Sequence, residues 1–126
     1  FMVKTILSLL ISAGLLAAAA IGEYIFVDRQ FETFGASLAA LEDKVREESA
    51  VRGDAESVRT LWESKKKKLH AVIPHNDISY IDYWLGEAVS FTESKDYVQA
   101  LSKIEVLLTL CEQIPQTYTL SFENIF

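Results

Sequence analysis

The chain begins with a long run of apolar positions. Lys4 and Glu23 bracket 18 residues without a charge, TILSLLISAGLLAAAAIG, and apolar residues resume after Glu23 as Tyr-Ile-Phe-Val. A helix of this length rises about 27 Å, close to the roughly 30 Å hydrocarbon core of a bilayer. The pattern therefore predicts that residues 1–27 form an N-terminal membrane anchor.

Two other interpretations of this stretch have to be weighed. A cleaved signal peptide would begin with a basic residue such as Lys4 and end in small residues such as Ala17–Ala20. However, the apolar core of a signal peptide is usually only ~7–15 residues long. A helix buried in a soluble core would need more surrounding chain than a bundle of about 100 residues provides. An uncleaved signal anchor is favoured, with cleavage as the alternative.

The apolar positions then change to a helical repeat. They recur at alternating steps of three and four, as is typical of bundle helices, at Tyr24, Val27, Phe31, Phe34, Leu38, Leu41 and Val45. Because the repeat starts where the bilayer should end, we predict one continuous helix that leaves the membrane and runs to about Arg52. Gly53 and Asp54 then predict a tight reversal, with the aspartate capping the next helix.

Three further helices follow from the same kind of pattern, over about 54–72, 77–94 and 97–114. Asn76 or Asp77 is expected to cap the third helix, and Pro115 to end the fourth. Apolar and polar residues alternate beyond Pro115, which predicts an extended C-terminal tail. Such short connections make neighbouring helices antiparallel.

The predicted fold class is therefore all-α. An N-terminal transmembrane helix is continuous with an antiparallel bundle of about four helices, which occupies residues 28–126 and ends in the extended tail. The N-terminal helix makes the lipid bilayer the first expected partner.

The charge of the body excludes one class of partner. Removing Lys4 and Glu23 from the 12 basic and 18 acidic residues leaves the body with a formal net charge of −6. Proteins bind phosphate backbones mainly through clustered Lys and Arg. We therefore expect no nucleic-acid partner. Cys111 is the only cysteine, so the chain alone can form neither a disulfide nor a thiolate zinc site.

Two histidines are the best candidates for metal ligands. His70 and His75 flank a turn that contains Pro74, and Asp77 and Asp82 follow closely. Imidazole and carboxylate groups both bind divalent metals, but this spacing matches no closed site and the turn needs Asp77 as a helix cap. His70, His75 and Asp77 are weak candidates only. With no catalytic constellation and no phosphate-binding loop, we expect neither a cofactor nor enzymatic activity.

Four consecutive lysines, Lys65–Lys68, suggest contact with lipid headgroups. If the first body helix ran to Arg52 and the second descended from Asp54, these lysines would lie roughly 15–20 Å above the membrane. The Debye length is only about 8 Å at physiological salt. We therefore interpret them as a solvated surface near a helix C-terminus, where the dipole favours positive charge.

Small residues recur every four positions within the anchor, at Gly14, Ala18 and Gly22. Such a ladder lets two transmembrane helices approach closely. It predicts self-association of the anchor, and hence a homodimer as an alternative to a different protein partner.

The order of parts resembles a known family, domain-of-unknown-function family 4363. The resemblance covers nearly the whole chain and rests on the anchor, the helical body, Trp62, the segment HNDISYIDYWL over 75–85 and the closing SFENIF over 121–126. It implies a small anchored protein of Clostridia-like bacteria, at the surface of a Gram-positive cell. The family has no assigned activity, so no functional residue can be carried over.

The expected function is that of an interaction or scaffold module, anchored by a single pass in the cell membrane. The signal-like start at Lys4 favours a body outside the cytoplasm, because Arg29 and Lys44 leave the positive-inside count undecided. A ligand-sensing domain is the alternative and a metal-dependent enzyme the third. A deep apolar cavity would favour ligand sensing, whereas a closed core with an exposed apolar patch would favour interaction.

Overall fold

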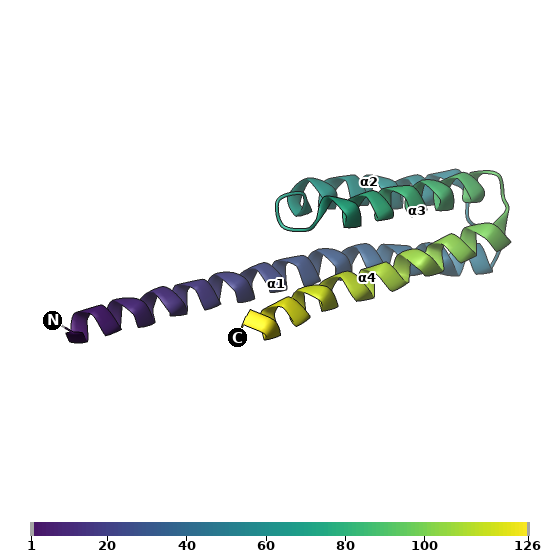
Figure 1. Ribbon diagram of the computed structural model, residues 1–126. Coiled ribbons are helices and arrows are strands. Elements are labelled where there is room, and N and C mark those ends of the chain that lie inside the picture. The colour runs from purple at the N-terminus through teal and green to yellow at the C-terminus, as the bar shows by residue number, and fades with distance from the viewer. Residues whose placement is uncertain (1, 126) are drawn as a thin grey trace.

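Four α-helices build the chain in a computed structural model that describes the backbone of residues 2–125 and the side chains of residues 2–117. The helices are α1 (Met2–Arg46), α2 (Arg52–Leu69), α3 (His75–Glu93) and α4 (Tyr97–Ile125), and the described residues contain no strand. Each helix runs opposite to the one before it, and α1 extends well beyond the other three (Figure 1). The predicted all-α bundle, continuous with a long N-terminal helix, is confirmed.

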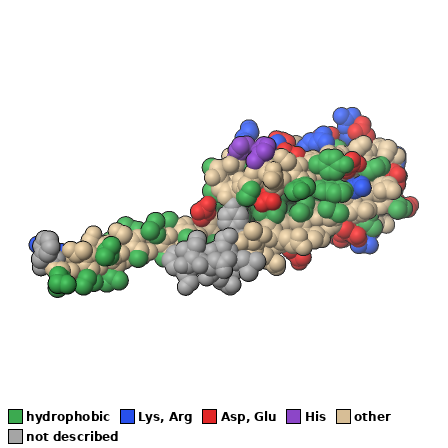
Figure 2. Space-filling view, in the orientation of Figure 1, with side chains coloured by type: hydrophobic (Ala, Val, Ile, Leu, Met, Phe, Trp, Pro, Cys, Tyr) green, Lys and Arg blue, Asp and Glu red, His purple; other side chains and the backbone are tan. Residues whose placement is uncertain are grey.

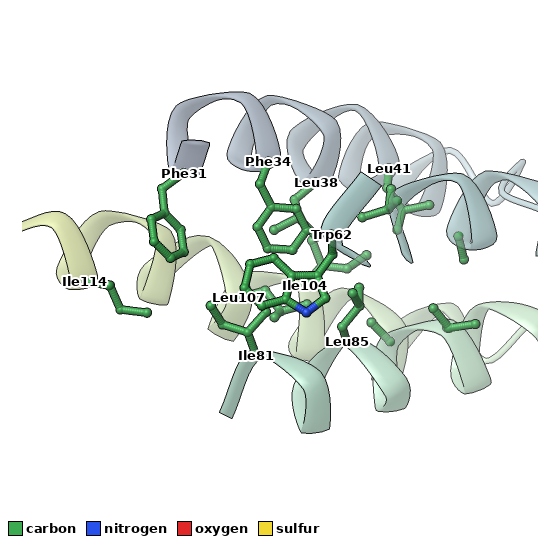
Figure 3. Close-up of a cluster of buried hydrophobic side chains, with 14 of the residues drawn as sticks. Phe31, Phe34, Leu38, Leu41, Trp62, Ile81, Leu85, Ile104, Leu107 and Ile114 are labelled. Carbon is green, nitrogen blue, oxygen red and sulfur yellow. The ribbon is translucent and has the colours of Figure 1, made fainter. Parts of the chain in front are cut away.

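The core lies where the four helices face one another. α1 packs against α2 and α4, and α3 packs against the same two helices, so each helix has two neighbours. The predicted apolar repeat of α1 is buried from Val27 to Val45, while Tyr24 is half-buried. Figure 3 shows how side chains of all four helices converge, with the rings of Phe31 and Phe34 beside the indole of Trp62. Burial of this seam stabilises the bundle.

The first turn differs from the prediction, because α1 ends at Arg46 and not near Arg52. Glu48 adopts a left-handed conformation with φ of 56°, and the Ser49 N–H bonds to the Lys44 carbonyl at 2.9 Å. This is the hydrogen bond of a Schellman motif, which usually has glycine at the left-handed position. Here Glu48 occupies that position, at a cost of about 1–2 kcal/mol for a residue with a Cβ. Because the residue is not glycine, the sequence gives no signal for this turn.

Gly53 and Asp54, predicted to form the reversal, lie in the first turn of α2 instead. Asp54 still caps the helix, since its Oδ2 accepts the Val51 N–H at 2.9 Å. Its other oxygen, Oδ1, lies 2.8 Å from Lys44 Nζ and so ties α2 to the end of α1. Asp54 thus stabilises the start of α2 from the third helical position and not as the N-cap residue that was predicted, and the predicted turn was wrong by about six residues.

The remaining two turns lie close to their predicted places. α3 begins at His75 with Pro74 as its N-cap residue, so Asn76 and Asp77 lie inside the first turn and are not caps, contrary to prediction. An acidic residue in the first turn is still favoured by the helix dipole. Between α3 and α4, the Asp96 carboxylate accepts the Gln99 N–H at 3.3 Å, which stabilises the start of α4.

The predicted extended tail is wrong for the backbone, because α4 continues through Pro115 to Ile125. A proline inside a helix removes one hydrogen bond but leaves the following residues free to remain helical. Ile114, Tyr118, Phe122 and Ile125 are also spaced by four, four and three residues, so this segment carries a helical pattern beside the alternating one. The side chains beyond residue 117 lie outside the described residues.

Candidate functional site

The N-terminal half of α1 projects from the bundle, and none of its described side chains is fully buried. Its large apolar side chains are exposed, for example Leu9 at 65% and Leu16 at 69%, and Figure 2 shows hydrophobic side chains along this projecting segment. Among the described residues, α1 is the one helix long and apolar enough to cross a membrane, and none of its apolar window is buried. The alternative of a buried core helix is therefore excluded, whereas a signal sequence would satisfy the same test.

The helix passes from this exposed segment into the bundle without a break. Tyr24 and Phe26 are half-buried, and Val27 is the first fully buried residue. The backbone of α1 stays helical across this boundary. No break in the helix therefore separates the exposed segment from the bundle.

The small-residue ladder lies on this exposed segment. A Cβ added at Gly14 or Gly22 would meet no atom of the described residues within 4 Å, and Ala18 is exposed. No contact within the described chain therefore requires small residues at these positions. Self-association through the ladder stays a prediction.

The structure brings the two histidines together but adds no further donor. His70 and His75 are exposed at the ends of the α2–α3 turn, with 6.1 Å between their ring centroids. Burial raises the pKa of the nearby Asp77 carboxyl above its ordinary value. Within residues 2–117, no three side chains of the metal-binding types gather into a group that could hold an ion. The pair lacks the third protein ligand that catalytic zinc sites have.

Asp82, the other carboxylate near this turn, has a structural role. Its Oδ1 accepts the indole N–H of Trp62 at 2.7 Å and lies 3.3 Å from Lys66 Nζ. Glu63 lies 3.0 Å from the same ammonium group. The two contacts of Asp82 hold α2 against α3, and they occupy its Oδ1 with a hydrogen-bond donor and an ammonium group.

Cys111 lies on the side of α4 that faces α1, where a Cβ on Gly35 would be 3.8 Å from the Cys111 Cβ. Burial raises the pKa of its thiol to about 12. A reactive cysteine has a lowered pKa, because the thiolate is the nucleophile. Cys111 therefore serves as a small apolar side chain at a close approach of two helices.

Two open hollows mark the surface of the bundle. One, of about 240 Å³, lies between α1 and α2 and is lined in part by Lys44 and Asp54, which pair across it. The other, of about 460 Å³, lies over α3 beside Tyr80, Tyr83 and Trp84. Both open broadly to solvent, whereas small-molecule sites are usually deep and mostly apolar.

Beside the second hollow, three aromatic side chains form what we call the aromatic surface of α3: Tyr80, Tyr83 and Trp84. Tyr80 is 59% exposed and Tyr83 is 60% exposed. The rings of Tyr83 and Trp84 meet edge to face at 5.3 Å between centroids, and Lys103 Nζ lies 5.1 Å from the centre of the Trp84 ring. The aromatic surface is therefore held in place by its own contacts and by α4.

Sequence reasoning did not find this surface. The helical pattern did not single out the two tyrosines, although Tyr80, Tyr83 and Trp84 are spaced by three and one residues. In the structure Ile81 and Leu85 occupy the core and Trp84 is half-buried. The missed signal was a second apolar face on the same helix, opposite to the first.

Comparison with known proteins identifies the family but no activity. A family model described as a domain of unknown function (DUF4363) matches residues 24–125. The match starts at Tyr24, so most of the exposed apolar segment of α1 lies outside it. No curated protein and no solved structure matches the chain.

Proposed function

On the premise that the chain belongs to the DUF4363 family, a domain of unknown function, we propose that it is a single-pass membrane protein whose bundle binds or scaffolds other proteins. The bundle lies outside the cytoplasm in this proposal. The observation that carries it is the combination of an unburied apolar helix with a closed bundle that exposes aromatic side chains.

The exposed segment of α1 supports the anchor. Its leucines and isoleucines are exposed, and none of its apolar window is buried by the rest of the described chain. Burying one such side chain is favourable by about 1.5–3 kcal/mol, so a segment with many of them gains strongly from leaving water. A bilayer provides that environment for a helix of this length.

The aromatic surface of α3 supports the role in binding. Tyr and Trp are enriched in protein interfaces, where they supply large contact areas and often dominate the binding energy. Tyr80 and Tyr83 are exposed on α3, and Lys103 places a positive charge over the ring of the neighbouring Trp84. The hollow next to them is too open to enclose a small ligand, which disfavours the ligand-sensing alternative.

Membrane extraction tests the anchor. The full chain expressed in cells should remain in the membrane pellet after alkaline carbonate washing, with the mass of the uncleaved polypeptide. Leu9→Arg combined with Leu16→Arg should release it, because each charge at the centre of a span costs about 2.5–3.5 kcal/mol. Recovery of a soluble, shortened body would show that the segment is a cleaved signal. Protection of the body from protease added to intact cells would show that it lies in the cytoplasm.

Site-specific photo-crosslinking tests the binding role. A photoreactive residue at Tyr80 or Tyr83 in the membrane-anchored chain should give one defined crosslinked protein. The same residue at Val98, which is 81% exposed on α4, serves as the control and should not capture that protein. Equal capture from all three positions, or none from any, would contradict binding through the aromatic surface.

A further inference from the structure

The aromatic contacts of Trp62 fix the level at which α2 ends along α1. The centroid of its ring lies 5.0 Å from that of Phe34 and 6.4 Å from that of Phe31. The two helices run in opposite directions, side by side (Figure 1). At about 1.5 Å per residue, Lys68 lies roughly 9 Å beyond Trp62 toward the N-terminal end of α1. It is therefore level with residues 25–28 of α1.

This level corrects the height expected for the lysines. The expectation of roughly 15–20 Å assumed that α1 continued to Arg52, but α1 ends at Arg46 and α2 starts its descent lower. Lys68 lies only about 2–6 Å along the axis from Tyr24, where the exposed apolar segment ends. Its charge is thus within one Debye length, about 8 Å, of the surface of a bilayer that holds this segment.

The lysines at this level are available for a partner. Within the described residues, Lys65, Lys67 and Lys68 have no carboxylate within 4.0 Å, whereas Lys66 pairs with Glu63 and Asp82. Lys67 and Lys68 are exposed. The positive charge at this end of the bundle is concentrated on α2. At the same level, α1 carries one basic residue, Arg29, and three acidic residues, Glu23, Asp28 and Glu32.

The turn that follows completes a surface directed toward the anchor. The α2–α3 connection lies at the end of the bundle from which α1 projects (Figure 1), and the two histidine side chains mark this end in Figure 2. His70, Ala71 and Pro74 are exposed, while Ile73 is buried and holds the turn on the core. The backbone of this turn is therefore fixed close to the level of the lysines.

We propose that this end of the bundle, residues 65–75, binds the phosphate groups of anionic phospholipids in the leaflet from which α1 emerges. The inference rests on the proposed membrane anchor and goes beyond it. The ammonium groups of Lys65, Lys67 and Lys68 supply the attraction, and lysine charges near an anionic surface each strengthen binding about fivefold. The bundle then stands on the membrane through two contacts, α1 and the lysine-rich end of α2, which fixes its orientation.

Hydrogen exchange of the full chain in nanodiscs tests this contact. One set of discs contains phosphatidylcholine alone, and the other contains about one third phosphatidylglycerol as the anionic lipid. Amides of residues 66–75 should exchange more slowly in the anionic discs. The difference should disappear at about 1 M salt, where the Debye length falls to about 3 Å. Inorganic phosphate added to the neutral discs should not reproduce the protection.

Two double variants of equal charge make the test specific. Lys67→Gln with Lys68→Gln should reduce the lipid-dependent protection by up to about 25-fold, from about fivefold per lysine. Arg52→Gln with Lys95→Gln removes the same charge at the opposite end of the bundle and should leave it unchanged.

The outcomes separate this inference from the proposed function. Equal exchange of residues 66–75 in both discs, with residues 5–22 strongly protected, would overturn the lipid contact and leave the anchor intact. Free exchange of residues 5–22 in the discs would overturn the anchor itself. Protection by inorganic phosphate in neutral discs would show that the lysines bind a free anion and would overturn the lipid assignment.

Discussion

The indole N–H of Trp62 donates a hydrogen bond to the Asp82 carboxylate, with 2.7 Å between Nε1 and Oδ1. The Trp62 side chain is otherwise enclosed, with its ring against Phe34 and Phe31. Trp62 thus bonds its indole N–H to α3, while the apolar surface of its ring packs on α1 and fixes the register of α2 along α1. The level of the lysine-rich end relative to the anchor depends on this side chain.

Trp62→Phe should lower the free energy of unfolding by about 1.5–3 kcal/mol, because it removes a hydrogen bond to a charged group and leaves unfilled volume in the core. Denaturant unfolding of the full chain in detergent, followed by far-UV circular dichroism, measures this. Trp84→Phe is the matched control, since Trp84 is half-buried at the surface. An equal effect of both substitutions would show that the enclosed position of Trp62 has no special importance.

Asp54 should make the stability of the bundle depend on pH. The Lys44 ammonium and then the Val51 N–H hold the pKa of the Asp54 carboxyl below its ordinary value of 3.8. Because the folded-state pKa is the lower one, the stabilisation is fully present above about pH 3.8 and is lost as the pH falls through the folded-state value.

Asp54→Ala should therefore destabilise the chain by about 0.5–1 kcal/mol at neutral pH, and the difference from the natural chain should shrink in acid. Unfolding measured across this pH range checks both parts. Asp43→Ala removes an exposed carboxylate that has no ion pair within the described residues, so it should show a smaller loss. A constant difference at every pH would mean that Asp54 acts through packing and not through its charge.

Cys111 should resist alkylation in the folded protein. Burial raises the pKa of its thiol from 9.0 to about 12, which lowers the thiolate fraction near pH 8 by about a thousandfold. The rate of reaction with iodoacetamide, followed by mass spectrometry, measures this. The thiol introduced by Ser102→Cys on the exposed side of α4, with Cys111→Ala, should react at an ordinary rate. Similar rates for the two thiols would contradict the raised pKa of the partly buried Cys111 thiol.

The ladder of small residues predicts a contact between two anchors. Ala18→Leu should abolish self-association of the full chain in membranes, measured with a dimerisation reporter, because close packing of two helices needs a small side chain there. Ala19→Leu places the same bulk on a neighbouring face of α1 and should leave the signal unchanged. Undiminished association of the Ala18→Leu chain would show that the ladder is not the contact.

The sequence predicted the helices well because their positions follow from local periodicity. The repeat from Val27 to Val45 is buried as expected, and the turn before Tyr97 lies at its predicted place. The first turn was misplaced because the left-handed residue is Glu48, for which propensity gives no signal. The end of α4 was misplaced because Pro115 was taken as a stop, although α4 continues through it despite the lost hydrogen bond and the clash of its ring with the carbonyl four residues earlier.

The sequence by itself determined the apolar N-terminal helix, its continuity with the bundle and the inward faces, since each depends on hydrophobicity and spacing along a single segment. Only the tertiary structure decided that Lys68 lies level with the end of the exposed segment and that Tyr80 and Tyr83 face outward. Both relations depend on where the turn between α1 and α2 lies and on how the Trp62 ring packs against Phe34. Such contacts join residues far apart in the chain, and no local pattern encodes their register.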